Sequence, residues 1–251
     1  MGKLDGKVAL ITGSGRGMGR SHALLMAEEG AGIILQDIDR DLLASTESEL
    51  KAKGARVHVM ACDVVDVKAF AAAAAEAEKA LGGIDILVNN AGIDSPGLFD
   101  DITEESFHRM YDVHVKGSFF AAKAVVPGMK SRRSGKIVNV SSIWGMVGHH
   151  THSHYCSAKA AILGLTKAWA KEFAPWNINV NAIAPGGVIT EMVLRKGGMD
   201  YVNQQLHRIP LRRYSECIEM SYTVLFLSCH ESDFITGQVI SPNGGETIVG
   251  I

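Results

Sequence analysis

The chain has 251 residues, of which 47% are hydrophobic, and a formal net charge of −2. This length and composition suit one α/β domain with a large core, and they exclude a disordered or highly charged chain. Because the charge is nearly balanced and no apolar run reaches membrane-spanning length, we expect no nucleic-acid partner and no membrane partner.

Short apolar runs alternate with helix-forming stretches along the whole chain. In chain order we expect strand 7–12, helix 17–29, strand 32–37, helix 39–53, strand 55–62, helix 67–81, strand 84–89, helix 104–130, strand 135–141, helix 155–173, strand 178–183, helix 215–228 and strand 237–241. This alternation at βαβ spacing predicts one doubly wound α/β domain over residues 1–251, with a seven-stranded parallel sheet and helices on both faces.

One long stretch, residues 189–211, interrupts this regular alternation. It carries the irregular signals Gly197, Gly198 and Pro210. A connection of this length inside a compact domain is usually functional, so we interpret it as a substrate lid.

The N-terminal residues and the cysteines predict a cytoplasmic protein. Residues 1–13 carry charges and glycines where a signal peptide needs an apolar core. Gly2 does not begin a myristoylation signal, because Gly6 occupies the position of the expected Ser or Thr. The cysteines show no paired metal-binding spacing, and we interpret them as reduced and mostly buried: Cys62, Cys156, Cys217 and Cys229.

A glycine-rich turn, TGSGRGMG at residues 12–19, follows the first strand and opens the first helix. Gly13, Gly17 and Gly19 have the spacing Gly-x-x-x-Gly-x-Gly, which differs from the strict G-x-G-x-x-G fingerprint. Glycines let the backbone approach a pyrophosphate, whose charge the helix N-terminus stabilises. At this junction the turn predicts a dinucleotide site.

An acidic residue, Asp37, ends the second strand. A carboxylate there can accept hydrogen bonds from the adenosine ribose and repels a 2′-phosphate, which favours NAD over NADP. The alternative is an N-cap for the next helix, a role that Asp39 can fill equally well. Arg16 in the glycine turn favours a phosphate, but we give more weight to the direct repulsion by Asp37.

Two further polar groups follow strands. Asp63 comes just after the third strand, where it can reach the adenine, and NNAG at residues 89–92 ends the fourth. Ligands of open α/β sheets bind at the carboxyl ends of the strands, so these groups and the glycine turn should meet at one edge.

Tyr155 and Lys159 are four residues apart, so on a helix they share one face. An ammonium group held there favours the ionised phenol, whose ordinary pKa is near ~10. Such a pair can also arise by accident on an exposed helix, and the pair alone does not separate the two interpretations.

Several motifs together identify a resemblance. They are TGSGRGMG at 12–19, NNAG at 89–92, Ser142 thirteen residues before Tyr155, YCSAK at 155–159, PGGVIT at 185–190 and the C-terminal run 226–245. Over essentially its whole length the chain resembles a short-chain dehydrogenase/reductase of the single-domain type. The resemblance implies a Rossmann-type fold and hydride transfer between a nicotinamide cofactor and a secondary alcohol or ketone.

The resemblance also implies roles for individual residues. Tyr155 would be the catalytic acid/base, Lys159 would lower its pKa, and Ser142 would hydrogen-bond the substrate oxygen. The implied cofactor-binding residues are Gly13, Arg16, Gly17, Met18, Gly19, Asp37, Asp63, Val64, Asn90, Tyr155, Lys159, Val188 and Thr190.

The chain departs from the family pattern at one catalytic position. Where the family usually has an asparagine that holds a relay water behind the lysine, DVHVKG at 112–117 places His114. An imidazole can donate or accept, so it can keep the relay with an altered pH dependence, or it simply packs. Both interpretations stay open from the sequence.

Histidines crowd the stretch between Ser142 and Tyr155, at positions 149, 150, 152 and 154. No carboxylate or cysteine in the stretch completes a metal-binding set, so we expect an exposed loop and no metal. The resemblance places Trp144, His149, His152, Gly187 and Arg195 nearest the substrate. These residues suggest a polar substrate, and the basic residues Arg195, Lys196 and Arg208 suggest an anionic one unless they are simply solvated.

The leading hypothesis is therefore an NAD-dependent alcohol dehydrogenase or carbonyl reductase. The alternatives are an NADPH-dependent 3-oxoacyl-thioester reductase and a catalytically silent nucleotide-binding protein. The two helices at 104–130 and 155–173 carry apolar residues on more than one face, among them Phe119, Phe120 and Trp169. In the family such helices pair across a twofold axis, so the resemblance implies a homotetramer.

Overall fold

The computed structural model describes residues 2–249. Its centre is a seven-stranded sheet in the order β3-β2-β1-β4-β5-β6-β7, and every pairing is parallel. The strands are β1 Val8–Thr12, β2 Gly32–Asp37, β3 Val57–Ala61, β4 Ile86–Asn89, β5 Gly135–Val140, β6 Ile178–Ile183 and β7 Val239–Ile240. The prediction of a doubly wound, seven-stranded parallel sheet is confirmed.

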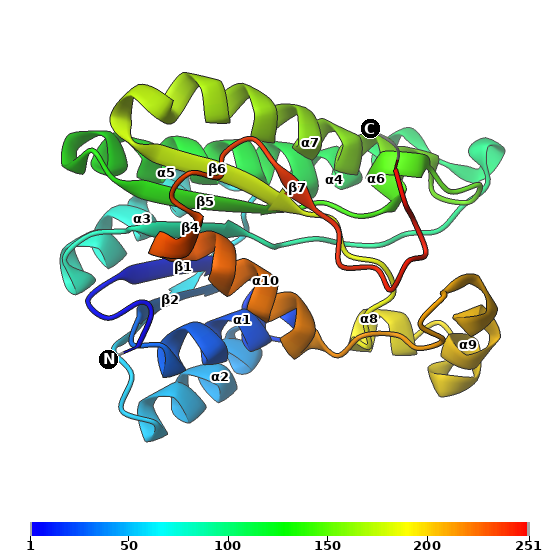
Figure 1. The fold of residues 1–251 in the computed structure, drawn as a ribbon, viewed down its shortest axis with the longest axis horizontal. Coiled ribbons are helices and arrows are strands. Elements are labelled where there is room, and N and C mark those ends of the chain that lie inside the picture. Colours follow the sequence, from blue (N-terminus) through cyan, green and yellow to red (C-terminus); the bar gives the residue numbers. More distant parts are fainter. Residues whose placement is uncertain (1, 250–251) are drawn as a thin grey trace.

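Helices cover both faces of the sheet (Figure 1). On one face lie α1 Gly17–Glu28, α2 Arg40–Ala52 and α10 Cys217–Ser228, and on the other lie α3 Val67–Leu81, α5 Gly117–Arg132 and α7 Ser153–Phe173. Each layer encloses its own buried apolar cluster. The central strands are apolar because both of their faces are covered, and all five residues of β1 are buried.

The strand order places the site. β1 pairs with β2 on one side and with β4 on the other, so the chain reverses its direction of winding beside β1. Such a switch point opens a crevice at the carboxyl ends of the strands. The glycine turn after β1 and the polar residues after β4 therefore meet there.

The long helix expected over residues 104–130 runs without a gap from Glu104 to Arg132, but its middle turn is π-helical, which was not predicted. It consists of α4 Glu104–Tyr111, a π-helical segment Asp112–Lys116 and α5, which ends at Arg132. One π turn adds a residue to the helix, re-aims the side chains of that turn, and often marks a functional site. His114 lies in this segment.

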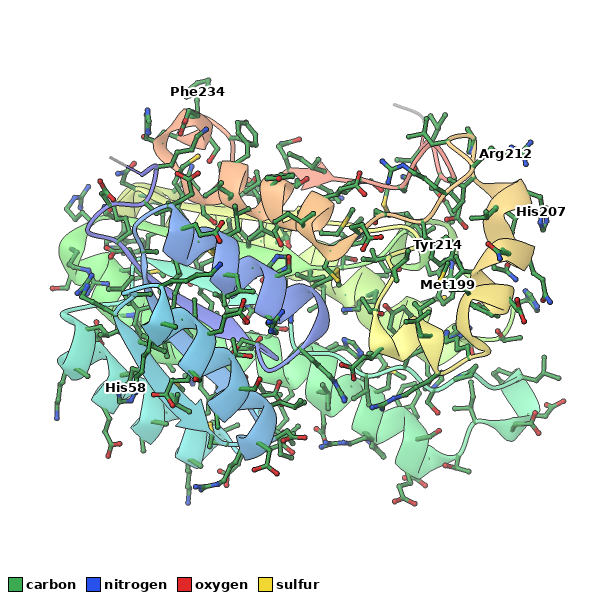
Figure 2. The ribbon with its side chains drawn as sticks, turned by 90° about the horizontal axis from the view of Figure 1, so that it is seen from below. His58, Met199, His207, Arg212, Tyr214 and Phe234 are labelled. Atoms are coloured by element: carbon green, nitrogen blue, oxygen red, sulfur yellow. The ribbon has the colours of Figure 1, made fainter. Side chains whose placement is uncertain are left out.

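The segment 189–211 is more ordered than its sequence suggests. It contains α8 Glu191–Leu194, α9 Gly198–Gln205 and a 3₁₀ turn Leu206–Arg208. The segment forms one end of the molecule, with His207 pointing outward from it (Figure 2). The short helix α6 Trp144–Val147 was also not expected.

Two further expectations can be compared with the structure. Within residues 2–249 no helix is both long and apolar enough to cross a membrane. All four cysteines are free, but only Cys229 is buried and the other three are half-buried, so the expectation of mostly buried cysteines is wrong.

Candidate active site

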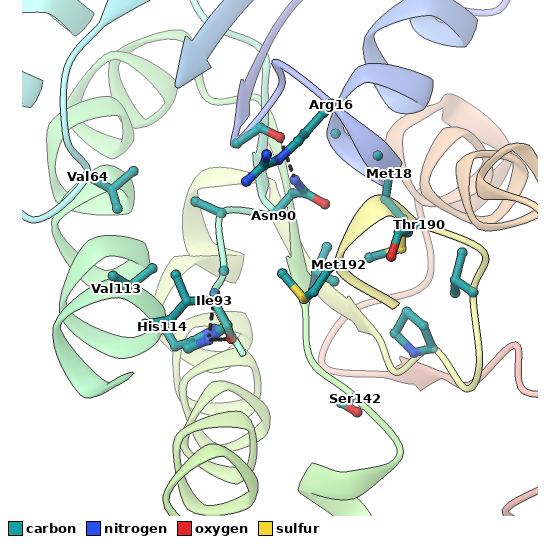
Figure 3. Close-up of a pocket in the computed structure, with 18 of the residues that line it drawn as sticks. Arg16, Met18, Val64, Asn90, Ile93, Val113, His114, Ser142, Thr190 and Met192 are labelled. Carbon is teal, nitrogen blue, oxygen red and sulfur yellow. Dashed lines mark hydrogen bonds between the residues drawn. The ribbon is translucent and has the colours of Figure 1, made fainter. Parts of the chain in front are cut away.

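A cavity of about 320 Å³ opens at the carboxyl edge of the sheet (Figure 3). All of the expected cofactor-binding residues line it: Gly13, Arg16, Gly17, Met18, Gly19, Asp37, Asp63, Val64, Asn90, Tyr155, Lys159, Val188 and Thr190. Ser142 and His114 line the same cavity. Residues from eight separate segments thus face one volume, and such convergence marks a ligand site.

The glycine turn is shaped by close backbone contacts. Gly13 has φ +65°, and a Cβ on Gly19 would lie 2.1 Å from the Gly13 carbonyl oxygen. Asn90 fixes the turn from the next strand, since its Nδ2 donates to the carbonyl oxygens of Thr12 at 2.9 Å and Gly13 at 3.1 Å. The cavity therefore receives the N-terminus of α1, a 12-residue helix whose unpaired N–H groups favour an anion.

The carboxylate of Asp37 is held against this turn. Its Oδ2 accepts from the Gly15 N–H at 3.0 Å, and its Oδ1 accepts from the Asp39 N–H at 3.2 Å. Asp39 is the N-cap of α2, accepting from the N–H groups of Asp41 and Leu42 at 3.1 Å each. The capping alternative for Asp37 is therefore wrong, and its negative charge faces the cavity.

Two other expected cofactor residues have structural partners as well. Asp63 lies 3.4 Å from an Arg109 guanidinium nitrogen, and its Oδ1 accepts from the Val65 N–H at 3.0 Å. Val64 is buried against Gly117, where a Cβ would lie 3.0 Å from a Val64 methyl group. Both residues lie at the cavity wall nearest β3, which suits the adenine end of a dinucleotide.

Ser142, Tyr155 and Lys159 come together at the inner end of the cavity. Ser142 follows β5, and its Oγ accepts from the Trp144 N–H at 3.2 Å. Lys159 lies on the same face of α7 as Tyr155, with its Nζ 5.7 Å from the phenol ring centroid. That Nζ donates to the Val140 carbonyl oxygen at 2.8 Å, so the last residue of β5 holds the ammonium in place.

Burial has the largest effect on the pKa values of Tyr155 and Lys159. It raises the pKa of Tyr155 above its ordinary value, and a hydrogen bond with Ser142 only partly opposes the shift. Burial also lowers the pKa of Lys159 to about 7. The net shift of the Tyr155 pKa in this structure is therefore upward, because loss of hydration is its largest cause.

Comparison with known proteins agrees with this geometry. A model of the short chain dehydrogenase family matches residues 7–199. The chain belongs to the short-chain dehydrogenase family. It is therefore an oxidoreductase of a family that uses a nicotinamide cofactor and acts on small molecules.

Relatives and solved structures match this short-chain dehydrogenase over nearly its whole length. It is 40% identical to the 3-oxoacyl-acyl-carrier-protein reductase FabG of Thermotoga maritima, over 98% of this chain and 100% of that protein. It is 38% identical to trans-4-hydroxycyclohexanecarboxylate dehydrogenase of Sinomonas cyclohexanicum, over 96% and 93%. Carveol dehydrogenase of Mycobacterium avium, solved with NAD, superposes with a TM-score of 0.94 at 31% identity, covering 98% and 99%.

His114 occupies the π segment of this short-chain dehydrogenase and packs against Tyr155. Its side chain is 2% exposed, and its ring meets the Tyr155 ring edge-on at 5.4 Å. Its Nε2 lies 2.9 Å from the Ile93 carbonyl oxygen (Figure 3), whereas its Nδ1 has no hydrogen-bond partner among residues 2–249. Burial and the charge of Lys159 hold the pKa of His114 well below its ordinary value, so the imidazole is neutral.

Thr190 and Val188 line the cavity from the start of the segment 189–211 and the loop before it. Val188 is buried and bridges to Ser215. Thr190 is the N-cap of α8, and its Oγ1 accepts from the Val193 N–H at 3.3 Å. These contacts fix the base of the segment to the body of the enzyme.

Apart from Ser142, the substrate-side residues expected from the resemblance do not line the cavity. Trp144 stacks on His149 with ring centroids 4.2 Å apart, and His149 Nδ1 lies 3.1 Å from His152 Nδ1. The three rings pack against one another beside Tyr155, whose ring lies 6.0 Å from Trp144 and 6.1 Å from His152. Their roles in substrate binding stay predictions.

A carboxylate that we did not predict completes this group. Asp94, in the loop after β4, has Oδ1 3.1 Å from His152 Nε2 and Oδ2 2.5 Å from Lys196 Nζ. Only Ile93 separates it from NNAG, but the sequence of the loop gives no sign that it folds back toward the histidines. Within residues 2–249 no set of three or more His, Cys, Asp or Glu side chains is arranged to hold a metal ion.

The other basic residues expected near the substrate have different surroundings. Arg195 is exposed and lies 3.7 Å from Glu191, which also lies 3.5 Å from Arg16. Arg208 is exposed and donates to the Gln205 side chain at 3.4 Å. Gly187 faces Tyr214 and lines a separate hollow beside α10. The structure thus brings the expected catalytic and cofactor-binding residues together and leaves Arg195 and Gly187 outside their cavity.

Proposed function

We propose that this enzyme is an NAD-dependent dehydrogenase that transfers a hydride between nicotinamide and a polar secondary alcohol or its ketone. One observation carries the proposal: Ser142, Tyr155 and Lys159 line the same cavity as the glycine turn and Asp37. Alcohol oxidation requires an acid/base group and a cofactor-binding site that face the same cavity.

The residues of the cavity fit a nicotinamide dinucleotide. The N-terminus of α1 and the glycine turn would hold the pyrophosphate, Asp37 the adenosine ribose, and Val188 and Thr190 the carboxamide. When bound, the nicotinamide supplies the hydride acceptor or donor. Lys159, held by the Val140 carbonyl, is placed to bind the ribose next to the ring.

The protein side of the reaction follows from the three residues at the inner end. Ser142 and the Tyr155 hydroxyl would hold the reacting oxygen between them, and Tyr155 would take the hydroxyl proton during oxidation and return it during reduction. A protonated Lys159 places positive charge 5.7 Å from the phenol ring, which favours the phenolate that oxidation needs. Ser142 would stabilise negative charge that develops on the substrate oxygen.

The cofactor preference rests on Asp37. Its carboxylate is fixed by the Gly15 and Asp39 N–H groups, so it cannot easily turn away from a 2′-phosphate. Arg16, the cation of the turn that could bind such a phosphate, lies 3.5 Å from Glu191. Both observations favour NAD over NADP.

The substrate is polar and uncharged in this proposal. Two of the three lid cations that could bind an anionic substrate already have acidic partners, since Lys196 pairs with Asp94 and Arg195 with Glu191. An anionic group would have to compete with these carboxylates, whereas a hydroxylated substrate can use both donors and acceptors nearby.

We extend the proposal to the lid and the assembly. The segment 189–211 would act as the substrate lid, since Lys196 reaches from it to the loop after β4. A cytoplasmic homotetramer is expected from the family, and exposed apolar side chains support association: Phe119 is 40% exposed and Tyr222 on α10 is 57% exposed. Val125, Ile162 and Trp169, in contrast, are buried within the chain itself.

Steady-state kinetics tests the function. We expect purified enzyme to oxidise polar secondary alcohols from a panel of polyols, hydroxy acids and simple alcohols, with a higher kcat/KM for NAD than for NADP. Tyr155→Phe should lower kcat by roughly 10²–10⁴-fold, the usual worth of a positioned acid/base. Tyr222→Phe, an exposed tyrosine on α10, is the matched control. Full activity of Tyr155→Phe would overturn the mechanism.

A second function has support from a relative. The 40% identity with FabG over the whole length favours a 3-oxoacyl-thioester reductase. In that case NADPH oxidation with an acetoacetyl thioester should exceed every NAD-linked alcohol oxidation in kcat/KM. The same panel therefore separates the two functions in one set of assays.

A further inference from the structure

Asp94 and Lys196 form an ion pair across the substrate side of the cleft. Asp94 lies in the loop after β4 and Lys196 between α8 and α9, about a hundred residues later in the chain. Their Oδ2 and Nζ atoms are 2.5 Å apart, and the Asp94 side chain is only 8% exposed. Lys196 and His152 hold the pKa of this carboxyl at about 2, although burial opposes them, so Asp94 is ionised.

This buried negative charge lies close to the catalytic tyrosine. His152 bridges the two, with Nε2 3.1 Å from Asp94 Oδ1 and its ring 6.1 Å from the Tyr155 ring. After burial itself, the charge of Asp94 is the main influence that raises the pKa of Tyr155. A negative charge in a poorly hydrated place opposes the formation of a second one nearby.

The other groups around Tyr155 do not by themselves offset the negative charge of Asp94. His114 packs against it from the π segment and is neutral, and Ser142 faces it from the loop after β5. Cys156 adjoins it in α7, with a thiol whose pKa burial raises, so the thiol is neutral as well. Lys159 is the cation on the cofactor side, and Lys196 is the cation on the side of Asp94.

We propose that the Asp94–Lys196 pair couples the lid to catalysis: Lys196, carried by the lid, offsets the negative charge that Asp94 otherwise presents to Tyr155. The inference rests on the proposed function, in which Tyr155 is the base. Closing the lid brings the ammonium onto Asp94 and makes the phenolate easier to form. Asp94 and Lys196 are thus positioning residues, which act on Tyr155 without touching the reacting atoms.

The coupling has a signature in the pH dependence. Asp94→Asn removes the opposing charge, so the midpoint of Tyr155 ionisation should fall by about one pH unit, the size expected for a charge about 12 Å away at an effective dielectric constant of about 20. Lys196→Met leaves Asp94 uncompensated, so the midpoint should rise by about one unit. In the double variant both charges are gone, and the midpoint should return toward that of the parent.

Two measurements locate the midpoint. The first is the pH profile of kcat/KM for oxidation of the best substrate by the full-length enzyme. The second needs no substrate: tyrosinate difference absorbance in saturating NAD, taken between each variant and its Tyr155→Phe counterpart, isolates the ionisation of Tyr155. Asp100→Asn in the same loop and Lys68→Met on α3 remove exposed charges of the same kinds and should leave the midpoint unchanged.

The outcomes separate the inference from the proposed function. Opposite shifts in the single variants and their cancellation in the double variant support the coupling. Unmoved midpoints, or shifts of both single variants in the same direction as a general disturbance would give, overturn it. An active Tyr155→Phe enzyme would instead overturn the proposed function, and this is visible in the parent background alone.

Discussion

The two sides of the cleft are built in different ways. On the cofactor side, the glycine turn, Asp37 and Asn90 are joined through backbone atoms, as in the contacts from Gly15 N–H to Asp37 and from Asn90 to the Thr12 and Gly13 carbonyls. On the substrate side, Asp94, His152 and Lys196 meet through side chains alone, from three separate segments. Backbone contacts fix the shape of the cofactor side whatever the substrate is. The side chains on the substrate side can differ between enzymes that act on different substrates.

The two sides also differ in their charges. The cofactor side presents a helix N-terminus and a fixed carboxylate, and neither needs to change when the ligand binds. The substrate side holds an ion pair between the loop after β4 and the segment 189–211. The fixed carboxylate of Asp37 thus lines the cavity together with Tyr155 and Lys159, whereas the Asp94–Lys196 pair lies outside its lining.

The largest effect should come from breaking the backbone shape of the cofactor side. A Cβ on Gly19 would lie 2.1 Å from the Gly13 carbonyl oxygen and 2.6 Å from Asn90 Nδ2, so Gly19→Ala must displace the turn. We expect a loss of about 3 kcal/mol in the free energy of unfolding, and much weaker binding of NADH.

Gly164→Ala is the matched control for that change. Gly164 is also helical, in α7, but a Cβ there meets nothing within 4 Å. This variant should gain roughly 0.5–1 kcal/mol, because alanine has less conformational freedom to lose. Urea unfolding and NADH fluorescence titration measure both variants. Equal behaviour of the two would show that the turn tolerates displacement and that its shape is not the basis of recognition.

The positions of the glycine turn and of the Tyr155–Lys159 pair could be predicted from the sequence because their signals are local. Strand, turn and helix follow one another within residues 8–28, and Tyr155 and Lys159 share a helix face at a spacing of four. The parallel sheet also follows from alternation along the chain. Such features depend on neighbours in sequence, which a single chain displays directly.

Asp94 and the π segment could not be predicted, because neither has a recognisable local signal in the sequence. Asp94 has no motif of its own, and its partners lie 58 and 102 residues further along, so only the folded chain shows the contact. Over the five residues Asp112–Lys116, the apolar pattern does not distinguish a π turn from an α turn. In the segment 189–211, the paired glycines and the proline indicated an irregular loop, so its two short helices were not predicted.

An effect of intermediate size should come from a substitution that removes the charge of Asp37 and keeps the shape of its side chain. Asp37→Asn keeps an oxygen acceptor for the neighbouring N–H groups but removes the repulsion of a 2′-phosphate. The ratio of kcat/KM for NAD over NADP should fall about tenfold, since each 1.4 kcal/mol of lost discrimination is one factor of ten.

Asp39→Asn removes the same charge two residues away and keeps an N-cap for α2, because Asn and Asp cap equally well. It should leave that ratio within about twofold of the parent, since the Asp39 side chain serves the helix and not the cavity. The measurement is kcat/KM with NAD and with NADP for the parent and for both variants. A similar fall in both variants would mean that net charge, and not the position of Asp37, sets the preference.

The smallest effect should come from His114, the neutral neighbour of Tyr155. Its imidazole is buried and uncharged, so it contributes no charge that could move the ionisation of Tyr155. In His114→Asn the pH profile of kcat/KM should therefore keep its midpoint to within about 0.3 unit, in contrast to the shift of about one unit expected for Asp94→Asn. His108→Asn, on the exposed face of α4, is the control. A clear shift in His114→Asn alone would instead give His114 a part in proton transfer, and would mean that the π segment, and not the lid, tunes the catalytic tyrosine.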